Sequence, residues 1–198
     1  MSQSPQLRFE NLGHQYFIGE KRYPGITELL KEFNLIPELK YYTDHSRDRG
    51  HAFHLARQFY DEGTLDIDTI DPQIRGHVDA YIEYRKQFPC KFLLSEVRMV
   101  SHLHRFCGTP DALVHDSEGF LLEEYKTGAP HETVRLQTAG QLRLVQENYP
   151  QFSTLRRRVI QFKANGKYSV KDLPMENIMR DQADFEALVR CHWLKRGE

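Results

Sequence analysis

The sequence has few cysteines, no long apolar run and no excess of charge of one sign. Its three cysteines, Cys90, Cys107 and Cys191, are far apart, and none belongs to a CxxC pair. This pattern excludes a disulfide framework and argues against a zinc knuckle, so a reducing, cytoplasmic setting is expected. The mean hydropathy is −0.65, and a sequence without a long apolar run is not expected to form a transmembrane helix.

Two further absences narrow the class of protein. The first residues lack a basic stretch followed by an apolar stretch, so we expect no secretory signal. The phosphate-binding pattern GxxxxGK followed by Ser or Thr is missing, which excludes an ATP-driven motor within this chain. With 27 Lys and Arg against 28 Asp and Glu, the formal net charge is −1. This balance argues against a polycationic coat protein for nucleic acid.

The order of predicted elements is that of a mixed α/β protein. For 198 residues we expect a single domain, 1–198, in which 1–45 form an N-terminal hairpin and helix extension and 46–198 form the core. The sequence predicts a hairpin over 14–23, helices over 28–34, 46–62, 73–88, 131–148 and 180–196, and strands over 93–102, 105–115, 119–127, 153–162 and 168–173. The strands would form a central sheet covered by helices. On the helix over 46–62, Leu55 and Phe59 predict the apolar side, with His54 on a different face.

Acidic and basic residues are separated along the second half of the chain. Residues 108–128 contain five acids and one base, Lys126, whereas residues 131–170 contain seven bases and two acids. An acidic pocket beside a basic surface would suit metal-dependent cleavage of a polyanion. A solvated mixture of charges explains the same distribution equally well.

The turn between the strands over 105–115 and 119–127 predicts a hairpin register. Whether the loop has two or four residues, paired residue numbers sum to 235, so Asp111 lies directly opposite Glu124. Directly opposed side chains have Cβ atoms about 4.5–5.5 Å apart, and like charges there are destabilising. Two carboxylates held in this way need a proton or a cation between them.

Strand alternation places a lysine beside this pair. Glu124 and Lys126 are two residues apart and share a face of the hairpin with Asp111. Carboxylate oxygens suit Mg²⁺, and an ammonium group could orient a bound water or neutralise developing negative charge. The simpler alternative is a surface hairpin on which Asp111 and Lys126 form an exposed ion pair worth roughly 0–1 kcal/mol.

These residues resemble a known family. Pro110-Asp111, twelve further residues and then Glu124-Tyr125-Lys126 resemble the signature of the PD-(D/E)xK nuclease superfamily. The chain is similar to its RecB-like branch, which includes phage exonucleases. A GxxxH motif on a helix before the sheet is matched by Gly50 to His54, a Glu on the preceding strand by Glu96, and a Gln on the helix after the lysine by Gln137. The resemblance spans about residues 14–150, with these elements in the family's order.

The resemblance implies a restriction-endonuclease-like core, with a central mixed β-sheet flanked by helices, and a metal-dependent DNA nuclease that hydrolyses phosphodiester bonds. It implies Mg²⁺ as cofactor, with Mn²⁺ as a substitute, bound by Asp111, Glu124 and His54. Lys126 would be the catalytic lysine, and Gln137 would position the lysine, a metal-bound water or the DNA backbone. The further candidates are Glu96 and Gln141, the latter standing where the family usually has an aromatic residue.

The expected partner is DNA, with a recombination or replication protein acting in trans as a further partner. Little of the chain is left for a base-reading domain, so we expect an exonuclease acting on DNA ends or single strands. Recombination, repair and phage DNA processing are compatible roles, in the cytoplasm of a bacterium or a phage-infected host. The expected backbone contacts are Arg135, Arg143, Arg156 and Arg158, and activity should fall as salt rises. The alternative is a catalytically weak fold of this superfamily that serves as a DNA- or protein-binding module.

Overall fold

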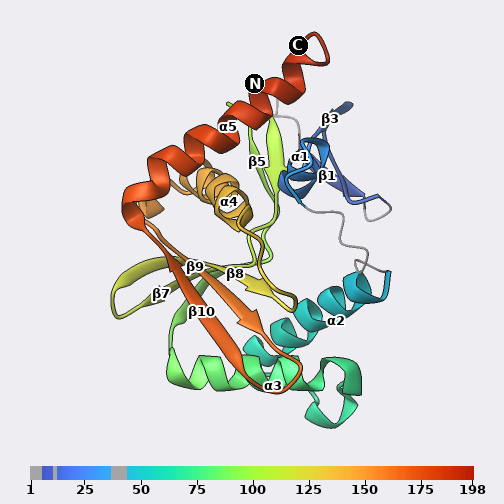
Figure 1. Ribbon diagram of the computed structural model, residues 1–198, viewed down its shortest axis with the longest axis vertical. Coiled ribbons are helices and arrows are strands. Elements are labelled where there is room, and N and C mark those ends of the chain that lie inside the picture. Colours follow the sequence, from blue (N-terminus) through green and yellow to red (C-terminus); the bar gives the residue numbers. More distant parts are fainter. Residues whose placement is uncertain (1–5, 11–12, 37–43) are drawn as a thin grey trace.

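The computed structural model describes residues 6–10, 13–36 and 44–198. They form an α/β structure in which helices cover both faces of a mixed five-stranded sheet, beside two smaller sheets (Figure 1). The fold class expected from the sequence is therefore confirmed. Among the described helices, none is both long enough and apolar enough to cross a membrane.

The central sheet has the strand order β10-β9-β8-β7-β4. Its members are β4 (Lys91–Ser95), β7 (Ala112–Asp116), β8 (Gly119–Lys126), β9 (Arg156–Phe162) and β10 (Tyr168–Leu173). Strands β8 and β9 are parallel and all other neighbours are antiparallel. The β7–β8 register runs from Asp116↔Gly119 to Ala112↔Glu123, so the hairpin register expected from the sequence is confirmed.

Two pairs of helices bury the two faces of this sheet. The first pair is α2 (Asp44–Asp61) and α3 (Pro72–Gln87), and the second is α4 (Val134–Asn148) and α5 (Ile178–Leu194). On β8, Leu121 and Tyr125 pack in the cluster with residues of α2 and α3, whereas Leu122 packs with residues of α4 and α5. This alternation places Glu124 and Lys126 on the α4 side of the sheet and Glu123 on the α2 side.

The two smaller sheets and α1 lie in the upper part of the molecule in Figure 1. A three-stranded sheet contains β1 (Leu7–Glu10), β2 (Gln15–Ile18) and β3 (Lys21–Tyr23), and α1 (Ile26–Glu32) follows it. A two-stranded sheet pairs β5 (Met99–Ser101) with β6 (Phe106–Gly108). The short 3-10 helices are η1 (Ile67–Thr69), η2 (Pro150–Phe152) and η3 (Met175–Asn177).

Two of the predicted strands are each divided in the structure. The strand expected over 93–102 breaks between β4 and β5, where Glu96 has a left-handed backbone with φ of 51°. The strand expected over 105–115 breaks between β6 and β7, around Pro110 and Asp111. The two breaks meet, because the backbone N–H of Glu96 donates to the carbonyl of Asp111 at 3.2 Å. The chain thus leaves the central sheet at two acidic residues.

The predicted apolar side of the helix over 46–62 is wrong. Leu55 and Phe59 are 46% and 40% exposed, whereas Phe53 and Arg57 are fully buried. The helix packs through the face that carries Phe53 and Arg57, because the Arg57 charge has carboxylate partners there. An apolar pattern alone cannot reveal a buried arginine whose partners come from other elements.

Candidate active site

The candidate site lies where β7 begins and β8 ends, beside α2. Asp111 directly precedes β7, and its Oδ2 accepts a 2.7 Å hydrogen bond from the backbone N–H of Tyr125 on β8. Asp111 and Glu124 are 8% and 2% exposed. The β7–β8 pairs end at Ala112↔Glu123, one residue short of Asp111 and Glu124, and both of these carboxylates are buried.

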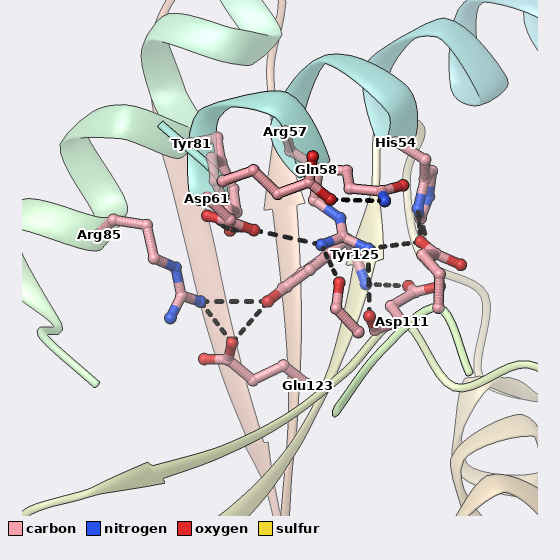
Figure 2. Close-up of polar contacts among 12 residues, drawn as sticks. His54, Arg57, Gln58, Asp61, Tyr81, Arg85, Asp111, Glu123 and Tyr125 are labelled. Carbon is pink, nitrogen blue, oxygen red and sulfur yellow. Dashed lines mark hydrogen bonds and ion pairs between the residues drawn. The ribbon is translucent and has the colours of Figure 1, made fainter. Parts of the chain in front are cut away.

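Three potential ligands converge on this point from separate elements. His54 Nδ1 on α2 lies 2.8 Å from Glu96 Oε1 and 3.8 Å from Asp111 Oδ1. One ligand atom from each of the three residues falls within 4.8 Å of the others. Figure 2 shows His54 on α2 above Asp111. Two carboxylates and an imidazole are a donor set that fits a divalent cation such as Mg²⁺ or Mn²⁺.

The pKa values of these groups reflect their mutual charges. Burial, followed by the negative charge of Glu124, raises the pKa of Asp111 to about 7. Burial lowers the pKa of His54, but the Asp111 and Glu96 carboxylates outweigh it, so the net pKa is raised. Burial raises the pKa of Glu96, but the charges and hydrogen bonds of His54 and Arg57 outweigh it and lower the pKa. A cation bound at this cluster would therefore compete with protons for the buried Asp111 carboxylate.

Glu124 adjoins this cluster, but its oxygens are occupied by amides and by a lysine. Its Oε1 accepts from Gln137 Nε2 at 2.7 Å and lies 2.6 Å from Lys126 Nζ. Its Oε2 accepts from Gln141 Nε2 at 2.6 Å. Lys126 also donates to Gln137 Oε1 at 3.0 Å. The structure thus gathers Lys126, Gln137 and Gln141 around Glu124, while His54 and Asp111 lie together with Glu96.

A buried arginine that sequence reasoning missed connects the cluster to the core. Arg57 is fully buried and bonds to Glu96 Oε1 and, at 3.1 Å, to the carbonyl of Asp111 (Figure 2). On its other side the guanidinium donates to Ser95 Oγ at 3.0 Å and to Asp61 Oδ2 at 3.3 Å. Arg57 stands three residues after His54, so both side chains lie on one side of α2. The three-residue spacing from His54 was the feature of the sequence that could have identified Arg57.

Glu123, the neighbour of Glu124, lies on the α2 side of the sheet, and its contacts are structural. It is 1% exposed and accepts from Tyr125 Oη at 2.7 Å, from Tyr84 Oη and from the Arg85 guanidinium (Figure 2). Glu123 thus forms a buried ion pair with Arg85 and is not part of the candidate site.

The four arginines expected to contact DNA each have a carboxylate partner. The ion pairs join Arg135 to Asp181 and Asp184, Arg143 to Glu186, Arg156 to Asp116 and Glu118, and Arg158 to Asp172. None of these partners is close to its arginine in sequence. The pairs reduce the local positive charge that a phosphate would meet, and DNA contact by these arginines stays a prediction.

Comparisons with known proteins found similar solved structures, of which two exonucleases are examples, but no similar sequence. No protein-family model matches the chain, and no curated protein matches it. A protein from Eubacterium rectale described as a candidate exonuclease is similar over 85% of this chain and 80% of its own, with 11% identity and a TM-score of 0.48. An alkaline exonuclease from Laribacter hongkongensis is similar over 88% of this chain and 92% of its own, with 14% identity and a TM-score of 0.35.

Proposed function

We propose that this protein is a metal-dependent nuclease that hydrolyses phosphodiester bonds in DNA, with Mg²⁺ as cofactor and Mn²⁺ as a substitute. The observation that carries the proposal is the convergence of His54, Glu96 and Asp111 within 4.8 Å of one another. A lysine held by a buried glutamate adjoins these ligands. Carboxylate oxygens that can bind a divalent cation, beside the positively charged Lys126, are the combination that phosphate chemistry requires.

Each residue has a role that follows from its contacts. His54, Glu96 and Asp111 would hold the cation, with Glu124 close enough for its charge to raise the pKa of Asp111. A bound divalent cation would supply Lewis-acid stabilisation of charge on the phosphate and would activate a water. Lys126 would place its ammonium against the phosphate oxygens, because Glu124 and Gln137 fix the position of Nζ. Gln137 and Gln141 would hold Glu124 in place.

The substrate class follows from what a compact site of this kind can recognise. Backbone contacts and a metal centre recognise phosphates without reading base sequence. We infer an exonuclease that works from DNA ends or on single strands, in recombination, repair or phage DNA processing. A protein acting in trans in one of these processes would be a further partner.

A cleavage assay tests the activity. Linear duplex DNA is incubated with the wild type and with Asp111→Asn in Mg²⁺, in Mn²⁺ and in EDTA. Cleavage by the wild type that needs the cation and disappears in Asp111→Asn is the expected result. DNA binding with no cleavage under any of these conditions would instead favour the alternative, a binding module of the same fold.

A second assay tests the mode of attack. A linear duplex, the same plasmid as a covalently closed circle and a single-stranded oligonucleotide are compared under the cleaving condition. Progressive loss of the linear and single-stranded DNA with the circle spared is expected. Discrete fragments from the closed circle would show a site-specific endonuclease and would refute the inference about ends.

A further inference from the structure

The face of the β9–β10 hairpin that continues from the candidate site carries three lysines. Lys126 on β8 pairs with Gln161 on β9, so these two side chains share the α4 side of the sheet. Gln161 pairs with Ser169, and Lys171 pairs with Val159, on the same side. By the same alternation Lys163 and Lys167, two residues beyond Gln161 and two before Ser169, lie on this side as well. We call Lys163, Lys167 and Lys171 the lysine face.

The lysine face has no carboxylate partners among the described residues. Lys163 and Lys167 are opposed across the hairpin, because the backbone N–H of Lys163 donates to the carbonyl of Lys167 at 2.8 Å and extends the β9–β10 register. Like charges directly opposite each other are destabilising. Within residues 6–10, 13–36 and 44–198, no carboxylate forms an ion pair with any of the three lysines. The arginines of β9 on the same hairpin, by contrast, all have carboxylate partners.

The turn that carries two of these lysines is firmly held. Gly166 adopts a left-handed φ of 77°, and its N–H donates to the carbonyl of Lys163 at 3.1 Å. The start of α3 packs directly on the turn, where a Cβ on Gly76 would lie 1.8 Å from the carbonyl oxygen of Ala164. His77 Nδ1 also bonds to the carbonyl of Phe162 at 2.8 Å. The turn between β9 and β10 thus has a fixed place beside α3 (Figure 1).

We propose that the lysine face binds the phosphate backbone of the DNA strand that enters the candidate site. This inference rests on the proposed function, since the surface extends from Lys126 along one side of the sheet. Lys163 lies two residues past Gln161, about 7 Å along the strand, and neighbouring strands are about 4.8 Å apart. Successive charges on one DNA strand are spaced about 3.4 Å along the helix axis, so this separation corresponds to about two nucleotide steps. The surface therefore offers repeated cation contacts that carry no sequence information.

The test compares two triple variants that remove the same charge from different surfaces. The first combines Lys163→Gln, Lys167→Gln and Lys171→Gln. The control combines Lys86→Gln, Lys91→Gln and Arg190→Gln, which are exposed positions with no carboxylate partner among the described residues. Thermal unfolding of each variant is measured first, so that only folded proteins are compared.

Binding is measured in EDTA, so that it does not depend on metal or hydrolysis. The probes are a fluorescein-labelled 20-mer of deoxythymidine and a labelled 20-base-pair duplex, followed by fluorescence anisotropy over a range of salt. Loss of three contacts to a single strand should reduce the slope of log affinity against log salt by about 2. If the variant and the wild type bind equally at 1 M salt, the variant then binds about 100-fold more weakly at 0.1 M salt. The control variant should bind as the wild type does. The comparison of the two probes shows which form of DNA the surface prefers.

The outcomes separate this proposal from the proposed function. Unchanged affinity and slope in the lysine-face variant, or an equal loss in the control, would overturn the lysine face. Wild-type protein that binds both probes through this face but cleaves nothing in Mg²⁺ or Mn²⁺ would support the lysine face and refute the nuclease. If the wild type cleaves, the lysine-face variant should show a raised KM and an unchanged kcat at saturating DNA, because the lost contacts are remote from the reacting phosphate.

Discussion

Asp111→Asn should make the metal-free protein more stable at neutral and alkaline pH, although it removes a central residue of the site. Burial and the charge of Glu124 raise the Asp111 pKa from 3.8 to about 7. An ionised Asp111 is therefore disfavoured in the folded protein relative to the unfolded chain. The penalty is absent below about pH 4, grows as the pH rises between the two pKa values, and is constant above them.

The magnitude follows from the size of this shift. A change of about 3 pKa units corresponds to about 4 kcal/mol, at about 1.36 kcal/mol for each unit. The raised pKa already includes the attraction of His54. The amide oxygen of the variant can still accept the Tyr125 N–H, but its NH₂ group adds a buried donor, which costs about 1–3 kcal/mol without a partner. We therefore expect a gain of about 2 kcal/mol at pH 8, which for a chain of this length raises Tm by about 4–8 °C.

Urea unfolding in EDTA at pH 5, 6, 7 and 8 measures the effect. Asp79→Asn is the control, because Asp79 forms an exposed pair with Arg75 and its loss should change stability by less than about 0.5 kcal/mol. Added Mn²⁺ or Mg²⁺ should stabilise the wild type and leave Asp111→Asn nearly unchanged. An Asp111→Asn protein that is less stable than the wild type at pH 8, or a difference that does not grow with pH, would refute the reasoning.

Three other substitutions probe separate parts of the structure. Lys126→Ala should lower the cleavage rate by about 100-fold or more while calorimetry shows metal binding retained; a parallel loss of metal binding would contradict its role at the phosphate. Glu96→Gln should lower metal affinity at least about 10-fold, measured by the same titration, and normal affinity would remove Glu96 from the ligand set. Gly76→Ala should lower the free energy of unfolding in urea by about 1–3 kcal/mol, because its Cβ would displace the turn at Ala164. The same displacement should weaken DNA binding. An unchanged anisotropy titration would show that the turn is not needed for binding.

The sequence was most informative where geometry is local. A tight turn and strand alternation were enough to set the β7–β8 register and to place Asp111 near Glu124, and the structure confirms the register. The breaks that divide two of the predicted strands could not be predicted from the local sequence. Glu96 adopts a left-handed backbone conformation, and its N–H donates to the carbonyl of Asp111, which lies just before β7. Such a break depends on a partner distant in sequence.

Ion pairs between residues distant in sequence explain why the surroundings of several arginines could not be predicted. Arg143 and Arg158 look available in a linear sequence, but Glu186 and Asp172 neutralise them in the fold. Arg57 looks like a solvated helical residue and is instead fully buried against Glu96. Pairing of this kind is set by tertiary packing, so a local pattern gives the type of a charged residue but not its environment.

The β7–β8 register determines which of two adjacent glutamates faces each side of the sheet. Glu123 and Glu124 are adjacent, yet one joins the buried arginine and tyrosine layer and the other faces the lysine and the two glutamines. A slip of one residue between β7 and β8 would exchange the two glutamates and turn Lys126 into the aromatic layer. An insertion or deletion between Asp116 and Gly119 is therefore tolerated only where the turn absorbs it and leaves the register unchanged. The segment after Lys126, over 127–133, lies outside the paired strands and can vary in length as well as in sequence.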